Sequence, residues 1–234
     1  GRLRAGELWP VVSASLADPA CRASAAAALA AGGEGALGEV EALFVAGAPT
    51  SVLLQAARVA GRIASPRAAE ALARQFGHPS PRVRDHVLEG LRACGWSPGP
   101  EDAARVEDRV REEVRGAAWA SAALRDLGGA PDAALLREAL EGEIDGARRR
   151  VLLLLALTGD APAIQRVGDA LAHGARDKRA YALEVLDVTL PAALRALVLP
   201  LMEDLAPAER AARLDDGPQQ VLVDGVEVVV DERL

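Results

Sequence analysis

The spacing of apolar residues along the chain predicts amphipathic helices. From each of residues 19, 49, 81, 114, 147 and 176, the sixth, seventh and tenth positions that follow are mostly apolar. These three positions fall on one face of a helix, as in a helix that buries one side. The starting residues lie about 30 residues apart, so one structural unit is predicted to recur along the chain.

A second helix is predicted before each of these segments. Apolar positions with helical spacing occur, for example, over residues 66–77, 101–114, 132–144 and 161–174. Glycine and proline mark the joins, as at Gly77 to Pro81 and Gly159 to Pro162, and they are typical of a helix end followed by a new helix start. The sequence therefore predicts an all-α, right-handed solenoid of about six helical hairpins over residues 1–216.

One interruption is expected within this array. The sequence GWSPGP, residues 95–100, breaks the repeat and predicts either a bend at residues 95–101 or a join between two sub-arrays. A second unusual segment, RRRVLLLLALTGD at residues 148–160, is too short in its apolar run to cross a membrane, which takes roughly 20 residues. We interpret it as the packed inner helix of the fifth hairpin.

The C-terminal residues 217–234 have a different pattern. Val-Leu-Val and Val-Glu-Val-Val-Val flank Asp224 and Gly225, which predicts a β-hairpin over residues 221–230. This short element either caps the apolar end of the array or begins a β-domain of a longer protein. Because an unpaired valine-rich edge invites strand addition, the hairpin also predicts a homodimer.

Composition and charge narrow the classes of function. Half of the residues are apolar but only 3% are aromatic, so small and leucine side chains build the predicted core. The net charge of −7 provides no general basic field, and we expect no nucleic-acid partner. Two distant cysteines, Cys21 and Cys94, do not form a disulfide framework and favour a reducing compartment. The chain begins with glycine, and we expect it to be part of something longer.

The paired helices resemble a known family. A proline that opens the second helix, the sequence PxVR and an alanine- and leucine-rich body that ends in glycine are similar to bacterial HEAT-like repeats. SPRVRDHVLEGLRACG, residues 80–95, carries the best match. Residues 135–205 further resemble the HEAT region attached to ATP/ADP-translocase-like transporters. That resemblance implies a regulatory segment at the cytoplasmic face of the inner membrane, with a transporter domain before it and a cyclic-nucleotide-binding-like domain after it.

Four arginines recur at the third position of the repeat segments: Arg22, Arg84, Arg150 and Arg179. One interpretation is structural, with each guanidinium bound to a carboxylate or carbonyl of the neighbouring repeat. The other places some of them along a concave groove that binds acidic peptide or phosphate. Trp96, in the irregular segment, is the tryptophan that we expect to be most exposed, whereas Trp119 is expected to pack. These five residues form the predicted interaction surface.

No catalytic, cofactor or metal site is predicted. GEGALG at residues 33–38 fits the dinucleotide-binding pattern, but a helix rather than a strand is predicted before it. The three histidines are not spaced as metal ligands. We therefore predict a non-catalytic interaction or regulatory module that binds a protein or neighbouring domains. A free cytosolic adaptor and a HEAT-type enzyme, either a lyase or a DNA glycosylase, are the alternatives.

Overall fold

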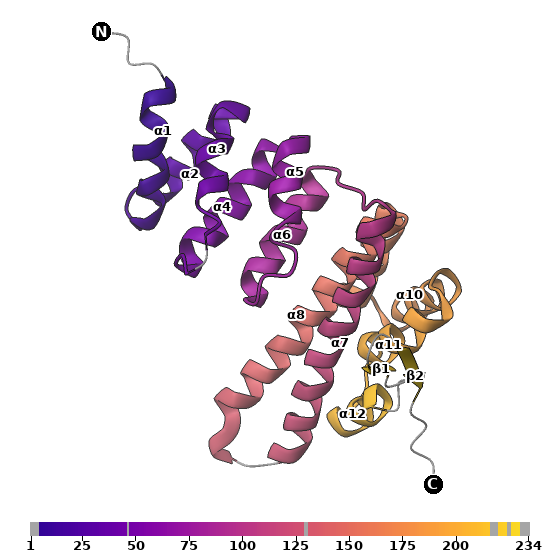
Figure 1. Cartoon of the computed structure of the whole chain (residues 1–234). Coiled ribbons are helices and arrows are strands. Elements are labelled where there is room, and N and C mark those ends of the chain that lie inside the picture. Colours follow the sequence, from indigo (N-terminus) through magenta and orange to yellow (C-terminus); the bar gives the residue numbers. More distant parts are fainter. Residues whose placement is uncertain (1–4, 46, 129–130, 216–219, 224–225, 230–234) are drawn as a thin grey trace. The chain divides into compact units, whose positions relative to one another are not determined.

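The structure, a computed structural model, describes residues 5–45, 47–128, 131–215, 220–223 and 226–229. The chain divides into two compact units, unit 1 over Gly1–Gly99 and unit 2 over Pro100–Leu234 (Figure 1). The division falls within the segment where the sequence predicts a bend or a join. Helices make up nearly all of both units, and this architecture fits an α-solenoid.

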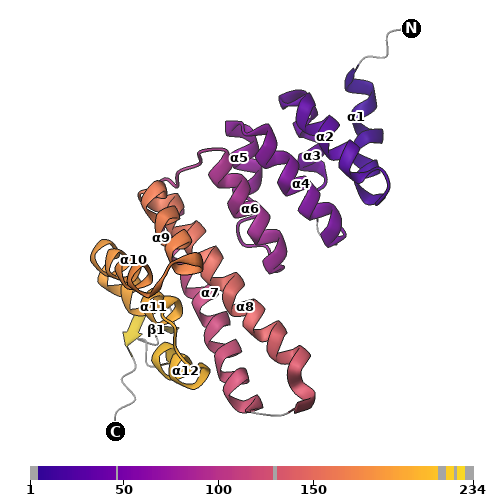
Figure 2. The same ribbon diagram turned by 180° about the vertical axis from the view of Figure 1, so that it is seen from behind.

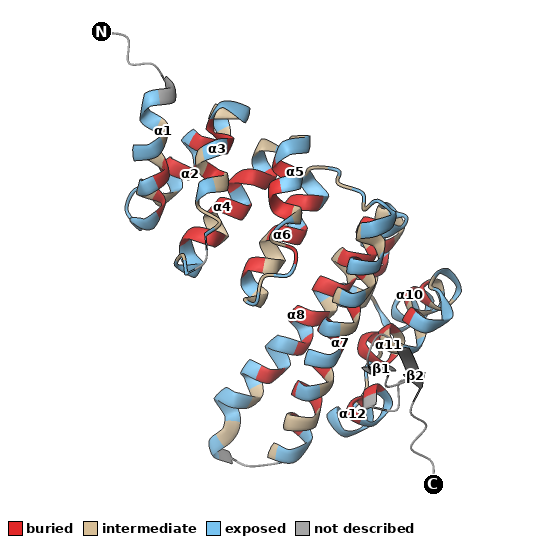
Figure 3. Cartoon of the chain, in the orientation of Figure 1, coloured by how far each residue is buried: buried red, intermediate tan, exposed pale blue. Residues whose placement is uncertain are grey.

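Unit 1 consists of short paired helices. They are α1 (Ala5–Ala14), α2 (Arg22–Gly32), α3 (Glu34–Ala42), α4 (Thr50–Ile63), α5 (Pro66–Ala73) and α6 (Pro81–Ala93), with a 3₁₀ turn at Ser15–Ala17. Helix α4 packs against α2, α3, α5 and α6, and it carries buried residues on several turns (Figure 3). The core of this unit therefore centres on α4.

Proline and N-cap residues set the helix starts that the sequence predicts. Ser65 accepts the backbone N–H of Ala68 at 3.1 Å, and Pro66 occupies the first turn of α5. In the same way, Asp160 accepts the N–H of Ala163 at 3.0 Å where α9 begins. These side chains satisfy N–H groups that a helix start leaves without an intrahelical partner.

Two glycines allow α4 and α6 to approach closely. A Cβ atom on Gly61 would lie 2.7 Å from the Cα atom of Gly90, and one on Gly90 would lie 2.8 Å from Leu72 Cδ1. Neither distance leaves room for a methyl group. The two glycines are therefore required by packing between the helices, and neither has an unusual φ.

Unit 2 begins with two long helices, α7 (Pro100–Leu127, 28 residues) and α8 (Ala134–Thr158, 25 residues). They lie side by side in both views of the chain (Figures 1 and 2). Four shorter helices follow: α9 (Ala161–His173), α10 (Arg176–Thr189), α11 (Ala192–Met202) and α12 (Pro207–Asp215). Helix α9 packs on α8, and α11 and α12 pack on α7, so the end of this unit returns to its first helix.

The long helices correct the predicted repeat count. Joints expected near Val114 and Ala147 are absent, because α7 and α8 continue through both positions. Buried positions succeed one another at intervals of three and four along α7, before and after Val114. A continuous helix and a pair of helices satisfy the same apolar pattern here, and no proline or positive-φ glycine ends the first one.

The two described strands lie at the C-terminal end. Strand β1 (Gln220–Val223) pairs antiparallel with β2 (Val226–Val229), with Val221 opposite Val228 and Leu222 opposite Glu227. Residues 224–225 and 230, which complete the hairpin in the sequence prediction, lie outside the described residues. Its role as a cap, as part of another domain or as a dimer contact stays a prediction.

Candidate interaction surface

The repeating arginines of unit 1 bind the turn that precedes their own helix. The same contact occurs again in the last helix of unit 2. The guanidinium groups donate to backbone carbonyls five or six residues earlier, with N···O distances of 2.7–3.1 Å: Arg22 to Leu16 and Ala17, Arg84 to His78 and Pro79, and Arg210 to Leu205. These bonds fix the turn onto the helix. They support the structural interpretation of the repeated arginine in these repeats.

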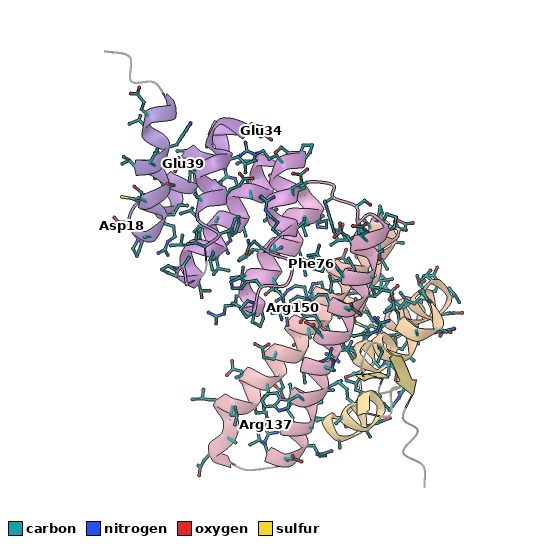
Figure 4. All side chains as sticks on the ribbon, in the orientation of Figure 1. Asp18, Glu34, Glu39, Phe76, Arg137 and Arg150 are labelled. Atoms are coloured by element: carbon teal, nitrogen blue, oxygen red, sulfur yellow. The ribbon has the colours of Figure 1, made fainter. Side chains whose placement is uncertain are left out.

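Arg150 lies in the interior and is not part of an interaction surface. Its side chain is 4% exposed and that of Glu113 is 3% exposed, and Arg150 Nε donates to Glu113 Oε2 at 2.8 Å between α7 and α8 (Figure 4). A Cβ atom on Gly146 would lie 2.8 Å from Arg150 Nη1, so this glycine leaves room for the guanidinium. Because α8 continues through Ala147, no preceding turn offers carbonyls, and the arginine binds a buried carboxylate instead.

Arg179 is the exposed member of the predicted set in unit 2. Its side chain is 45% exposed, and Nη1 lies 3.9 Å from Asp204 Oδ2. An exposed pair at this distance contributes little to stability. The four arginines therefore have three different environments, and they do not form one repeated ladder.

A second arginine contact holds the end of unit 2 to α8. Arg148 donates to the carbonyls of Leu201 at 2.8 Å and Glu203 at 3.1 Å, where α11 ends. Nearby, burial lowers the pKa of Arg210, and the positive charge of Arg148 lowers it further. Arg148 and Arg210 both donate to backbone carbonyls within unit 2, so their guanidinium groups do not form a basic patch that is open to a partner.

The exposure of Trp96 and Trp119 is the reverse of what the sequence predicts. Trp96 is only partly exposed, and its ring centroid lies 6.3 Å from that of the buried Phe76. Trp119 is instead 70% exposed on α7. Trp119 falls on the side of α7 opposite the buried Ala117, Ala120 and Leu124, so it points away from the core.

Helix α10 presents an exposed face that the sequence analysis missed. Four exposed residues on it, spaced four, three and four apart, share this face: Asp177, Tyr181, Glu184 and Val188. We call these residues the α10 face. Tyr181 is 68% exposed and Val188 is 75% exposed. The buried residues of the helix, Ala182 and Leu186, lie on another side and face the neighbouring helices.

The sequence does contain a pattern that indicates this exposed surface, at one position of the repeat segments. Trp119 and Tyr181 both occupy the fifth position after the start of a repeat segment, directly before the sixth position, which is alanine in both. The fifth position is exposed in both helices. An aromatic residue at a repeat position that points outward is therefore the pattern that indicates this surface.

The α10 face combines apolar and acidic side chains. The carboxylates of Asp177 and Glu184 lie one turn from the exposed Tyr181, and Val188 lies one turn beyond Glu184. Exposed large apolar side chains at helical spacing are typical of a surface that binds an apolar segment of a partner. The acids favour a partner segment that carries basic side chains beside its apolar ones.

The pKa values of both thiols are raised above the ordinary cysteine value. A hydrogen bond from the Cys21 thiol to Asp18, together with the negative charge of that carboxylate, raises the pKa of Cys21. Burial raises the pKa of Cys94. A raised pKa keeps a thiol protonated at neutral pH, and the thiolate is the reactive form.

The described residues form neither a metal-ion site nor a membrane-spanning helix. Within residues 5–45, 47–128, 131–215 and the two strands, no three His, Cys, Asp or Glu side chains are grouped to hold a metal ion. In the same part of the chain, no helix has the length and apolar character needed to span a membrane.

Comparison with known proteins gave one family match, over part of the chain. Residues 37–125 match the family described as HEAT repeats, from α3 to near the end of α7. No curated protein and no solved structure matches the chain. Residues 135–205, which carry the resemblance to the transporter-attached form, lie beyond the matched segment. The match supports a HEAT-repeat protein.

Proposed function

We propose that this chain is a non-catalytic interaction module that binds a basic, apolar segment of a protein partner on the α10 face. The observation that carries the proposal is the exposure of Tyr181 and Val188 on one face of α10, where the exposed carboxylates of Asp177 and Glu184 flank Tyr181 and Val188 follows Glu184. Aromatic residues are scarce in this chain, which has three tryptophans, one tyrosine and two phenylalanines. Its single tyrosine is mostly exposed and contributes little to the core.

The HEAT-repeat match supports the same class of function. HEAT repeats commonly mediate protein–protein interaction, and their stacked helices provide extended helix faces. The raised pKa values of both thiols also support a module without a cysteine nucleophile.

A photo-crosslinking experiment tests the α10 face. A photoreactive amino acid replaces Tyr181 in one sample and Arg176 in the control, an exposed residue of the same helix that lies off this face. We expect protein adducts from position 181, fewer from position 176, and fewer at high salt because salt screens the acidic groups. The crosslinked partner segment should carry Lys or Arg beside apolar residues. Equal adducts at both positions would contradict the proposal.

The resemblance of residues 135–205 supports a more specific form of this function. In that form, the module is the cytoplasmic part of an ATP/ADP-carrier-like nucleotide transporter at the inner membrane, and the partner segment belongs to a neighbouring domain. An immunoblot of fractionated source cells tests it. A band far above 24.3 kDa in the membrane pellet is expected. A soluble band near this mass would instead favour the free cytosolic adaptor.

A further inference from the structure

A cavity of about 440 Å³ opens in unit 1, within the segment that matches HEAT repeats. Its walls come from residues 44–45 and 47–48, which precede α4, from the first turn of α4, and from the connection between α5 and α6. Figure 1 shows the helices α3 to α6, which these connections join. The volume lies in the range of pockets that bind small molecules or single side chains.

Hydrogen-bonding side chains line one part of the cavity, namely Thr50, Gln75 and His78. His78 Nδ1 accepts the backbone N–H of Ser80 at 3.1 Å, so the ring hydrogen of the neutral imidazole lies on Nε2. Within the described residues, no hydrogen bond engages His78 Nε2, the Gln75 amide or the Thr50 hydroxyl. The residues that line the cavity therefore carry an imidazole N–H, an amide N–H₂ and a hydroxyl as donors.

The charge around these donors favours an anion. None of the described residues that line the cavity has an acidic side chain. Arg84 donates to the carbonyls of His78 and Pro79, each at 2.9 Å, so a guanidinium group lies next to this wall, where it also has a further partner of its own. A carboxylate accepts hydrogen bonds at both oxygens, so it matches several donors at once.

The remaining walls are apolar. Phe44, Val45, Leu53 and Pro79 line the cavity, and Leu53 is only 5% exposed. A ligand that fills this part must carry an aliphatic or aromatic group close to its polar end.

We propose that this cavity binds an organic carboxylate that carries an apolar substituent. His78 Nε2–H and the Gln75 amide donate to the carboxylate, and Phe44 and Leu53 contact the substituent. Two sources share this chemistry: the C-terminal residue of a peptide and a free apolar carboxylic acid. The site lies in unit 1 and does not involve the α10 face, so it goes beyond the function proposed above.

Isothermal titration with three probes tests the proposal on the full chain. N-acetyl-leucine presents a carboxylate, a leucine side chain and a peptide group, N-acetyl-leucinamide lacks the carboxylate, and 4-methylpentanoate lacks the peptide group. We expect N-acetyl-leucine to bind at least tenfold more tightly than its amide. Binding of 4-methylpentanoate as tight as that of N-acetyl-leucine indicates a free acid, and binding at least tenfold weaker indicates a peptide C-terminus.

Two variants assign the binding to the cavity. Gln75→Leu keeps the side-chain volume and removes the amide, and His78→Asn keeps an acceptor for the Ser80 N–H and removes the Nε2–H donor. Each is expected to weaken binding of the carboxylate by about tenfold, whereas Arg82→Ala, an exposed change on α6, leaves it unchanged. Circular dichroism confirms that the variants are folded. Equal affinity for acid and amide, no binding of either acid, or full affinity in both folded cavity variants would overturn the proposal.

Discussion

At the scale of single residues, an arginine near the start of a helix holds the preceding turn in place by hydrogen bonds to its backbone carbonyls. In Arg84, one guanidinium nitrogen reaches two successive carbonyls at the corner formed by His78 and Pro79. Carbonyls in a turn lack the regular partners of a helix, and a charged donor satisfies them more strongly than a neutral one. Arg22 and Arg210 make the same contact with the carbonyls of their preceding turns, so this contact recurs in several helical hairpins.

Removal of the Arg84 guanidinium is expected to destabilise unit 1. Arg84→Ala leaves two carbonyls without their charged donor, and we expect a loss of about 1–3 kcal/mol in the free energy of unfolding. Urea denaturation followed by circular dichroism measures it. The matched control is Arg82→Ala, two residues earlier and exposed, which should change stability by less than about 0.5 kcal/mol. Equal effects of the two changes would show that the carbonyl contacts do not matter.

Sequence and structure agree on the recurrence of arginine and disagree on its environment. The spacing from the start of each repeat segment identified Arg22, Arg84, Arg150 and Arg179, and the structural interpretation predicted carbonyl or carboxylate partners. Which partner applies depends on whether a turn precedes the residue. That depends in turn on helix length, which the arginine pattern does not contain.

At the scale of elements, the length of α7 and α8 was the main feature that the sequence could not predict. Proline and glycine correctly marked the starts of α5, α6 and α9. Within α7, however, Gly116 sits in the middle of the helix with no atom near its missing Cβ, so it permits a joint without requiring one. Packing between α7 and α8 along their full length stabilises each of them as one continuous helix.

The glycines of α7 and α4 should respond in opposite ways to substitution. Gly116→Ala places a methyl group in open space and removes the backbone entropy cost of a helical glycine, so we expect a gain of about 0.5–1 kcal/mol. Gly61→Ala forces a Cβ atom to within 2.7 Å of Gly90 Cα, so we expect a loss of about 1–3 kcal/mol or more. Thermal unfolding of both variants measures the difference. A gain for Gly61→Ala would mean that α4 and α6 do not approach so closely.

The α10 face shows why a surface is harder to infer from one sequence than a core. The apolar positions Ala182 and Leu186 follow the repeat and are buried, as the register predicts. Tyr181 and Val188 lie beside them in the sequence and are equally apolar, so composition alone assigns them to packing as well. The exposure of Tyr181 and Val188 depends on which side of α10 packs on α9 and α11, and the sequence of α10 alone does not contain that information.

At the scale of the whole molecule, each unit contains a core of its own. In unit 1, fully buried residues include Leu29, Leu72 and Val83, and in unit 2 they include Leu154 and Leu201. Both units lie within the size range of independently folding domains. The cavity belongs to unit 1 and the α10 face to unit 2, so the two proposed binding activities have separate structural supports.

Fragments that separate the two units should therefore fold and bind separately. We expect residues 1–99 and residues 100–234, each expressed alone, to give helical circular dichroism spectra that sum to the spectrum of the whole chain, with cooperative unfolding in each. The first fragment should retain binding of N-acetyl-leucine, and the second should retain crosslinking from position 181. A fragment without helical structure would show that its core depends on the other unit. In that case, loss of binding by the fragment would reflect loss of the fold, and the full-length chain would remain the test of each site.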